Sequence, residues 1–490
     1  MIRNLFVTIA TFLVLFGVSC REDQSFITEP NASIELSTDT ITFDTIFTSI
    51  GSTTKQLKIY NPHKQSVRIS KIYLGNGDNS FFRLNIDGEV SNSATDVEIP
   101  PKDSLYIFVE VTIDPFGVNN PLVVNDSIVF ITNGNMQDVN LMAYGQDVHL
   151  INGEIIESQT WTADKPYLVY NSMALDSSFT LTIEEGVKIY FHEGSQMIIL
   201  GTLLVNGTKD NPVIFRGDRL DEVLPDLPYD RIPGQWGGIV IYPYSTGNKL
   251  NYCHIRNAEI GLFLPGVLGY DYQAEIEIKN SIIENNSFAG VYAFNSIFTA
   301  WNCVISNCGT YTFAGLTGGK YHLYHCTIAN HYIRFSENVS SEPALTLTNF
   351  IYYNDSLITG DLKDSRFVNC IIDGQSPLQL QLVSKPDKTF EYLFENCLIE
   401  MVKDSIDADN TDLFKDVIFN KDPQFKKIPV SSDPVAERYT FDFSLDTLSP
   451  AKDSGTLEII NQLPELEYDI LGNSRTADGA PDIGAYERIE

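Results

Sequence analysis

Basic residues are scarce in this sequence. Its 490 residues include 33 Lys and Arg against 64 Asp and Glu, a formal net charge of −31. A surface of that sign repels phosphate backbones and anionic headgroups, which argues against nucleic acid as a partner. The same shortage of cations argues against a cationic cleft for uronic acids.

Cysteine is also rare. Cys20 is followed by six further cysteines, and an even number in an exported chain leaves a disulfide framework open. A free cysteine behaves as a small buried apolar residue, and we expect that role here. No Cys-x-x-Cys pair occurs, so we expect no metal site, and we expect no cofactor.

Long apolar runs are absent apart from "LFVTIATFLVLFGV" at residues 5–18, which follows Arg3 and is too short to span a membrane. The run ends in "GVSC", which resembles the lipobox of bacterial lipoproteins. That resemblance implies a signal peptide at residues 1–19 and acyl chains, palmitate among them, on Cys20. The alternative is an ordinary secretory signal with a chance cysteine. The next four residues, "REDQ", resemble the acidic export signal of Bacteroidetes lipoproteins, which implies a lipid-anchored outer-membrane protein at the cell surface.

Residues 20–32 are polar and unperiodic, as a tether would be. Residues 33–150 contain short alternating strands separated by turn residues, which predicts an antiparallel β-sandwich. The phrases "LKIYNP", "VRISKI", "IPPKDSLYIFVEVTIDP" and "VNLMAYGQ" follow in that order and resemble Hydin-type immunoglobulin-like domains. The resemblance implies a spacer or docking module.

A repeat occupies residues 155–430. Phrases such as "NCVIS", "HCTIA", "NCIID" and "NCLIE" place a marker residue, usually cysteine, at 253, 281, 303, 326, 350, 370 and 397, with Ser281 and Phe350 replacing cysteine. A period near 24 residues made of short strands predicts a parallel β-helix, in which markers stack in the core. The asparagines that precede markers should form one corner of every coil; they are Asn280, Asn302, Asn349, Asn369 and Asn396.

The first coils, from "TWTADKPYLVY" onward, resemble those of right-handed pectate-lyase-like β-helices. The end of the chain, with "DPQF", "FSLDTLSPAKDSG" and "DILGNSRTADGAPDIGAYE", resembles the choice-of-anchor Q module of bacterial surface proteins. We therefore predict an all-β chain, with an immunoglobulin-like β-sandwich followed by a right-handed parallel β-helix. Residues 431–490 should be a cap that covers the open end of the helix.

No catalytic residues are predicted. The polygalacturonase Gly-His-Gly and Arg-Ile-Lys phrases are missing, as are the pectate lyase and pectin esterase phrases. We expect a non-enzymatic protein that binds a glycan or serves as a subunit beside an outer-membrane barrel protein. The alternative is a polysaccharide-degrading lyase or glycoside hydrolase, since the many acids leave a catalytic pair open. His325 replaces asparagine at the corner, where a structural role is expected.

Two insertions, at residues 218–233 and 265–273, interrupt neighbouring coils and should flank one outward face. On this face, "GIVIYPY", "GLFLPG" and "GVYAFN" align so that Gly238, Gly261 and Gly290 coincide. Alternation then turns an aromatic ladder outward, and we predict a ligand or partner site at Tyr229, Tyr242, Phe263, Tyr270, Tyr272, Tyr292 and Phe294. A register off by one would bury these rings.

Asp-Ser/Thr-aliphatic phrases recur along the chain and resemble the O-glycosylation phrase of Bacteroidetes, although Asp-Ser also marks turns. The candidate acceptors are Thr40, Thr45, Ser104, Ser127, Ser356, Ser405 and Thr447.

Overall fold

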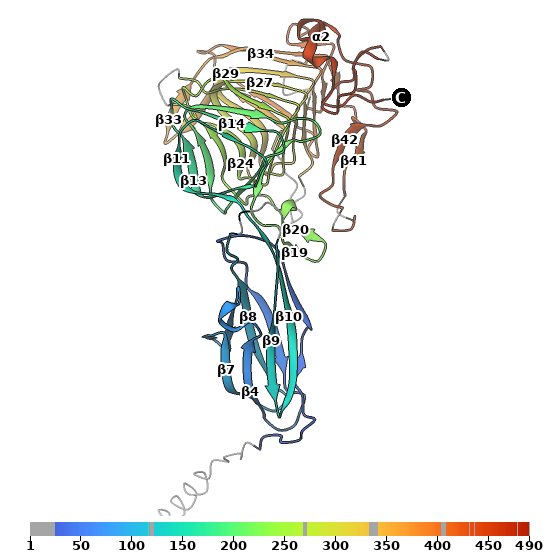
Figure 1. The fold of residues 1–490 in the computed structure, drawn as a ribbon. Coiled ribbons are helices and arrows are strands. Elements are labelled where there is room, and N and C mark those ends of the chain that lie inside the picture. Colours follow the sequence, from blue (N-terminus) through green and yellow to red (C-terminus); the bar gives the residue numbers. More distant parts are fainter. Residues whose placement is uncertain are drawn as a thin grey trace, which may run out of the picture. The chain divides into compact units, whose positions relative to one another are not determined.

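A computed structural model describes residues 25–115, 117, 122–267, 272–332, 342–402, 408–430, 432–435, 437–477 and 479–489 (Figure 1). Cys20, the "REDQ" segment, Tyr270 and Ser405 lie outside the described residues. The chain divides into two compact units, Met1–Asp147 and Val148–Glu490. Within the described ranges, no helix is both long enough and apolar enough to cross a membrane.

The N-terminal unit consists of two five-stranded sheets. One has the order β1 (Glu35–Leu36), β3 (Lys55–Tyr60), β8 (Ser104–Val111), β5 (Phe82–Ile86) and β6 (Glu89–Val90). The other has the order β2 (Thr40–Phe47), β10 (Asn135–Gln146), β9 (Leu122–Thr132), β4 (Val67–Leu74) and β7 (Ser93–Ile99). A short 3₁₀ turn, η1 (Gly77–Asn79), follows β4. All pairs are antiparallel except β2 with β10.

Strict alternation in these strands builds the core. In β8, Leu105, Ile107, Val109 and Val111 are at most 4% exposed, whereas the residues between them face solvent. Successive side chains of a strand point to opposite faces, so one face of each sheet becomes apolar and the two faces pack together. The predicted immunoglobulin-like β-sandwich is confirmed.

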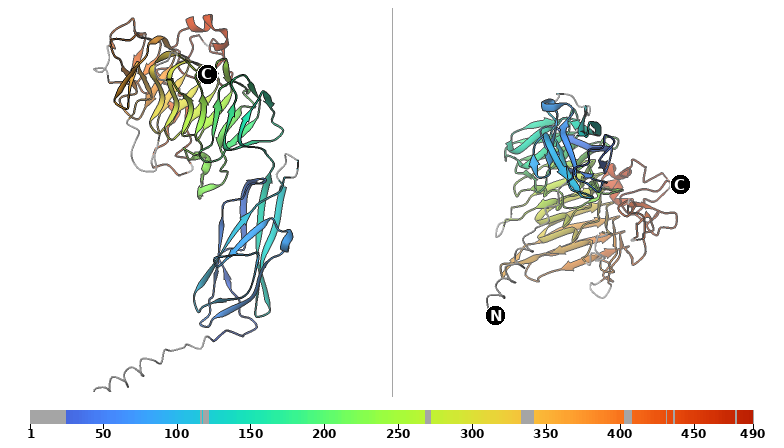
Figure 2. Two further views of the ribbon diagram at one scale, coloured as in Figure 1. Left: turned by 90° about the vertical axis from the view of Figure 1, so that its left-hand side faces the viewer. Right: turned by 90° about the horizontal axis from the view of Figure 1, so that it is seen from below.

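The second unit is built on one 26-stranded sheet wound into coils, with all its neighbouring coils paired in parallel (Figure 2). It begins with β11 (His149–Ile156), which pairs with β13 (Tyr167–Leu175). From there each coil contributes strands to three faces. This confirms the predicted parallel β-helix.

The three faces consist of the following strands. The first face contains β15 (Lys188–Phe191), β18 (Val213–Gly217), β23 (Cys253–Arg256), β26 (Ile282–Glu284), β28 (Val304–Ser306), β30 (Thr327–Asn330), β35 (Ile371–Gly374), β38 (Leu398–Ile399) and β40 (Ile418–Phe419). The second face contains β16 (Gln196–Ile199), β21 (Gly238–Ile241), β24 (Ile260–Leu264), the first parts of β27 (Ala289–Trp301) and β29 (Tyr311–Tyr324), β31 (Leu345–Thr348) and β36 (Leu380–Val383). The third face contains β12 (Gln159–Trp161), β14 (Thr180–Glu184), β17 (Thr202–Asn206), β22 (Asn248–Asn251), β25 (Glu275–Lys279), the second parts of β27 and β29, β34 (Leu362–Val368), β37 (Phe390–Glu395) and β39 (Phe414–Lys415).

The markers form one column inside the helix. The register of the first face pairs His254 with Ile282, Ile282 with Val304, Val304 with Thr327 and Thr327 with Ile371. The residues just before these therefore stack, and every cysteine among them is buried. All six cysteines that the structure describes are free thiols, so the column is held by packing and not by disulfides.

Phe350 is not part of this column, contrary to prediction. Residues 350–359 form an antiparallel hairpin, β32 (Phe350–Tyr353) with β33 (Ser356–Thr359), which lies outside the large sheet. The column passes directly from Cys326 to Cys370, because Thr327 pairs with Ile371. The 44-residue step from Cys326 to Cys370 is one coil that carries an insertion, and its length equals about two periods of the repeat only by chance.

The asparagine corner lies between the third and first faces. Asn280, Asn302, Asn369 and Asn396 have φ values of 52°, 53°, 55° and 47°, a left-handed conformation that asparagine tolerates better than most residues. Asn302 donates to Asn280 Oδ1 at 3.1 Å, which links neighbouring coils. Asn349, which starts the inserted hairpin, does not share this conformation.

His325 takes the same corner conformation, with φ of 49°. Its ring is fully buried, and Asn369 Nδ2 lies 2.8 Å from His325 Nε2. Burial, together with the charge of Arg475, holds the pKa of His325 well below its usual value, so the ring is neutral and accepts this hydrogen bond. These contacts give His325 the structural role expected for it.

The C-terminal segment packs along the side of the helix, across several coils of the first face. Phe443 and Ala485 pack on Val304 and Ala329, while Leu445 and Ile483 pack on Ile371 and Leu398. The segment contains β41 (Phe425–Lys427), β42 (Asp442–Leu445), α2 (Glu458–Gln462) and η4 (Pro464–Glu467). We expected a cover for the open end of the helix, but these contacts show a lateral cover of an apolar outer face.

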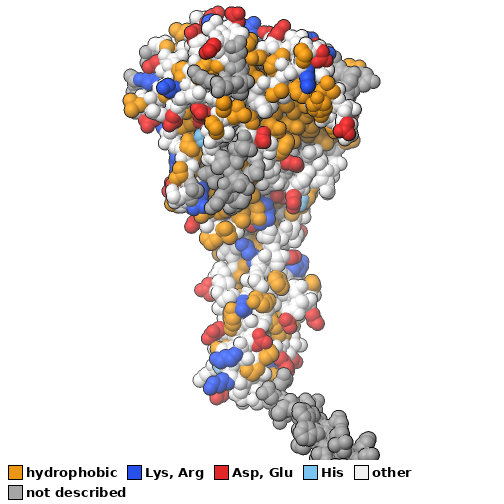
Figure 3. Space-filling view, turned by 180° about the vertical axis from the view of Figure 1, so that it is seen from behind, with side chains coloured by type: hydrophobic (Ala, Val, Ile, Leu, Met, Phe, Trp, Pro, Cys, Tyr) orange, Lys and Arg blue, Asp and Glu red, His pale blue; other side chains and the backbone are white. Residues whose placement is uncertain are grey.

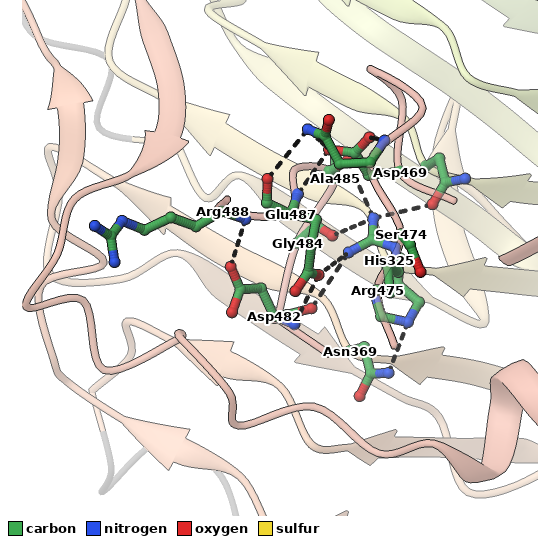
Figure 4. A network of polar contacts seen from close by, with 12 residues as sticks. His325, Asn369, Asp469, Ser474, Arg475, Asp482, Gly484, Ala485, Glu487 and Arg488 are labelled. Carbon is green, nitrogen blue, oxygen red and sulfur yellow. Dashed lines mark hydrogen bonds and ion pairs between the residues drawn. The ribbon is translucent and has the colours of Figure 1, made fainter. Parts of the chain in front are cut away.

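Arg475 joins this segment to the corner (Figure 4). Its guanidinium is completely buried, bonds Glu487 at 3.2 Å and donates to Asn302 Oδ1 at 3.1 Å and to the carbonyls of Gly484 and Ala485. A buried charge is tolerated only with such partners.

Replacing Arg475 by alanine should therefore destabilise the β-helix unit strongly. The loss should be about 3–5 kcal/mol, because Glu487 would stay buried without its cation. Arg366→Ala is the matched control, since its ion pair with Asp364 is 55% and 42% exposed and should be worth less than about 1 kcal/mol. Denaturant unfolding of both variants would measure this, and equal losses would contradict the account.

The buried thiols should be inert in the folded protein. Burial raises the pKa of Cys253 and of Cys308 to about 12, so neither is a thiolate near pH 8. In a Cys20→Ala chain, Ellman's reagent should report essentially no reaction at pH 8, and then six thiols after unfolding in guanidinium. Rapid reaction of any thiol before unfolding would show that the column is open to solvent.

Candidate functional site

A groove of about 1080 Å³ lies on the second face, at its corner with the third face. Residues 265–267 border one end, and the β32–β33 hairpin forms the other wall. Apolar side chains gather around a hollow on the β-helix unit in Figure 3. We call this site the aromatic groove, after the rings that line it: Phe263, Tyr292, Phe294, Tyr311, Phe350, Tyr352 and Tyr353.

The floor follows from the register of the second face. Ile239 pairs with Leu262 and Leu262 with Val291, and all three are fully buried in the helix core. Alternation then turns the next residue of each strand outward. Phe263 and Tyr292, which are paired neighbours, are half-buried and line the groove. The predicted register is confirmed.

Glycine at the start of each strand lets the coils approach closely. A Cβ on Gly290 would lie 2.6 Å from the Thr312 carbonyl oxygen, and one on Gly261 would lie 2.7 Å from the Gly290 carbonyl oxygen. Real Cβ atoms do not approach that closely, so the stacked corner requires glycine. The glycine column thereby permits the close stacking of the strands that carry the ladder.

The rings of the ladder touch one another. The Tyr292 centroid lies 6.0 Å from Phe263, 4.9 Å from Phe294 and 5.9 Å from Tyr311. Val240, the next residue of the column, is only 5% exposed, so the ladder begins at Phe263. The result is a continuous apolar strip across three coils, with hydroxyl groups at two of its rings.

The hairpin adds a second aromatic wall. Tyr352 and Tyr353 are 64% and 53% exposed, and the Lys385 ammonium lies 4.9 Å from the Phe350 centroid and 5.8 Å from that of Tyr352. Asn349 fixes the base of the hairpin, because its Nδ2 donates to the carbonyls of Lys385 and Lys388. Exposed aromatic rings on an anchored hairpin are suited to contact a ligand.

Among the described lining residues, Asp361 is the one carboxylate. It accepts a hydrogen bond from the Thr389 backbone N–H at 2.9 Å and lies 3.5 Å from the Lys363 ammonium. That hydrogen bond, with the charges of Lys388 and Lys363, lowers the pKa of Asp361, so the group is ionised at neutral pH. It cannot serve as a proton donor there.

The other predicted site residues lie elsewhere. The Arg219 guanidinium is 3.8 Å from the Tyr229 centroid, Tyr272 packs on Tyr244 at 4.2 Å, and Tyr242 is an exposed residue after β21. None of them is among the groove-lining residues, whereas Phe263, Tyr292 and Phe294 are. Tyr270 is outside the described residues.

The insertion at residues 218–233 does not flank the groove. It forms a small hairpin, β19 (Glu222–Leu224) with β20 (Leu227–Pro228), and a 3₁₀ turn, η2 (Tyr229–Arg231). Asn257 Nδ2 donates to the carbonyls of Asp230 and Ile232, which holds the insertion at the corner between the first and second faces. The two insertions lie at opposite corners of the second face, as expected, but the first does not line the groove, which the hairpin at residues 350–359 borders instead.

Three of the Asp-Ser/Thr phrases are held by local hydrogen bonds to their aspartates. The backbone N–H groups of Ser104, Ser127 and Thr447 each bond the carboxylate of the preceding aspartate, at 2.6–2.8 Å. Ser356 and Thr447 are exposed, while Thr40, Thr45, Ser104 and Ser127 are half-buried. O-glycosylation of these residues stays a prediction, as does modification of Ser405, which lies outside the described residues.

No group of three or more His, Cys, Asp or Glu side chains suited to hold a metal ion occurs in the described part of the chain.

Comparison with known proteins supports the fold of the second unit. Residues 153–266 match the family model described as a pectate-lyase like beta helix domain. No curated protein matches the chain.

Similarity to solved structures is distant. The Agl-KA catalytic domain is 11% identical, with a TM-score of 0.29, and the alignment covers 71% of this chain and 76% of that one. A PapD-like domain of human CEP192 is 12% identical, with a TM-score of 0.17, over 27% of this chain and 95% of that domain. A family 123 glycoside hydrolase from Clostridium perfringens is 8% identical, with a TM-score of 0.18, over 26% of this chain and 30% of that one. At these TM-scores the matches carry no functional argument.

Proposed function

We propose that this protein binds a polysaccharide in the aromatic groove without cleaving it, and that acyl chains on Cys20 anchor it to the outer membrane at the cell surface. The observation that supports binding is the ladder of Phe263, Tyr292, Phe294 and Tyr311 along the groove, faced by the rings of the hairpin. Flat rings with exposed apolar faces stack on the faces of sugar rings, and tyrosine hydroxyls add hydrogen bonds.

The arrangement of the groove suits an extended chain. The ladder crosses coils that are about 4.8 Å apart, and the groove continues past it to Thr346 and Gln381 on the next coils. A polymer lying parallel to the helix axis would meet one rung after another. The β-sandwich would then serve as a spacer between the anchor and the binding unit.

The lining argues for binding without hydrolysis. Glycoside hydrolysis uses two carboxyl groups, one of them protonated as the general acid. The described lining offers Asp361 alone, and its pKa is lowered instead of raised. A second carboxylate at catalytic distance is not among those lining residues.

Removing two rings of the ladder tests the proposed site. Phe263→Ala with Tyr292→Ala should abolish retention on polysaccharide columns, while the melting temperature changes little because both rings are half-buried. Leu262→Ala is the matched control: Leu262 is fully buried beside Phe263, so its loss should cost about 2–5 kcal/mol of stability but leave retention intact.

A panel of neutral and acidic polysaccharides, with release of oligosaccharides recorded, would measure both retention and turnover. Unchanged retention of the double variant would contradict the site. Turnover by the native protein would instead establish an enzyme, and co-purification with a membrane barrel without any glycan retention would favour a subunit role.

The anchor can be tested apart from the groove. Cys20→Ala should release the protein from membranes or leave the precursor uncleaved, because the acyl chains are attached to this cysteine in the proposal. Membrane fractionation and protease shaving of intact cells would measure anchoring and surface exposure. Normal processing together with unchanged membrane association would rule the lipid anchor out.

A further inference from the structure

The charge of the aromatic groove is opposite in sign to that of the whole chain. The charged side chains that line it are Lys320, Lys363, Lys388 and Asp361, three cations against one anion. The chain as a whole has 64 acids and 33 Lys and Arg. Because acidic residues outnumber basic ones over the whole chain, the excess of cations among the lining residues is a local feature of the groove.

The lysines gather at the end of the groove beside the hairpin. Lys320 is on the third-face part of β29, Lys363 is on β34 of the next coil, and Lys388 lies before β37. Ile297 pairs with Lys320 one coil away, so the lysines continue along the corner where the apolar lining ends. The rings and the cations therefore occupy successive parts of one groove.

The neighbouring acids neutralise this end of the groove only in part. Asp364 is shared between the Lys320 ammonium at 2.8 Å and the Arg366 guanidinium at 2.9 Å, and these cations lower the pKa of Asp364 to about 2. Asp361 is 3.5 Å from Lys363. Lys388 is exposed, and within the described residues no carboxylate forms an ion pair with its ammonium.

The further charges around these groups are mixed. They are His322, Lys385, Asp387 and Glu391, and His322 bonds the Asp364 carbonyl while Glu391 faces the Asp364 backbone N–H. Asp387 and Glu391 are not among the lining residues, whereas the three lysines are. The ammonium groups that a ligand would meet thus outnumber the carboxylates it would meet.

From this juxtaposition we infer that the ligand of the aromatic groove is an anionic polysaccharide. Its sugar rings stack on Phe263 and Tyr292, and its carboxylate or sulfate groups lie against Lys320, Lys363 and Lys388. The inference rests on the proposed function and names the class of ligand. Lysine ammonium groups suit both anions, because each offers a point charge with three donors.

The test compares acidic probes with their neutral counterparts. The probes are polygalacturonate, carboxyl-reduced polygalacturonate, dextran sulfate and dextran, which separate carboxylate, sulfate and sugar contributions. We expect at least one acidic probe to bind the native protein about tenfold or more tightly than its neutral counterpart at low salt, with the difference shrinking as salt rises.

Replacing the lysines should remove that preference. Lys320→Gln with Lys363→Gln and Lys388→Gln should bring the acidic probe to the affinity of its neutral counterpart. The control Lys188→Gln with Lys249→Gln and Lys421→Gln changes the net charge equally at exposed lysines outside the groove, and should keep the preference. If the triple variant does not fold, Lys388→Gln alone takes its place, because Lys388 is an exposed residue. This single change should weaken binding of the acidic probe several-fold.

The outcomes separate this inference from the proposed function. If the native protein binds acidic and neutral probes equally, and the Phe263→Ala, Tyr292→Ala variant binds neither, the inference is overturned and the binding function stands. A triple lysine variant that binds like its control would also overturn it. If none of the four probes binds, both proposals fall.

Discussion

Every coil of this β-helix repeats the backbone path of the coil before it, and the rest of the molecule depends on this parallel stacking. Equivalent residues stand about 4.8 Å apart, so a side chain that fits at one rung must also fit against its copies above and below. The column of thiols, the corner asparagines with their left-handed φ and the glycines of the second face all satisfy this condition. Extra residues are accommodated at the corners, where they do not disturb the ladders.

The same stacking produces the site. A residue that faces outward on one coil faces outward on the next, so Phe263 and Tyr292 become a strip and not isolated rings. The loop at 265–267 and the hairpin at 350–359 both leave the helix at the corner of the second and third faces, three coils apart, and they bound this strip. The opposite arrangement holds on the first face, where outward apolar residues such as Val304 and Ile371 are covered by the C-terminal segment. One face is closed by the chain itself, while another leaves its aromatic residues open.

Features that repeat from coil to coil were predictable from the sequence, whereas features that occur only once were not. The cysteine column, the register of Gly238 with Gly261 and the outward turn of Phe263 follow from alternation and a repeat. The hairpin at Phe350 was missed because the coil that carries it spans about two periods of the repeat, and Phe350 was therefore predicted to be a marker in the core although it lies on a hairpin outside the large sheet. Local charge was missed too: net charge averages over the surface, whereas Lys320 and its neighbours meet only after the chain folds.

Hydrogen–deuterium exchange with and without a bound polysaccharide tests the central claim most directly, because it maps the contact without any mutation. The account predicts slower exchange in three segments that are far apart in sequence, around residues 263–267, 292–297 and 350–361, since ligand would cover the edges of the groove. The insertion at 218–233 and the β-sandwich should exchange at unchanged rates. Protection confined to either of those, or absent from the hairpin under saturating ligand, would contradict the assignment of the aromatic groove as the binding site.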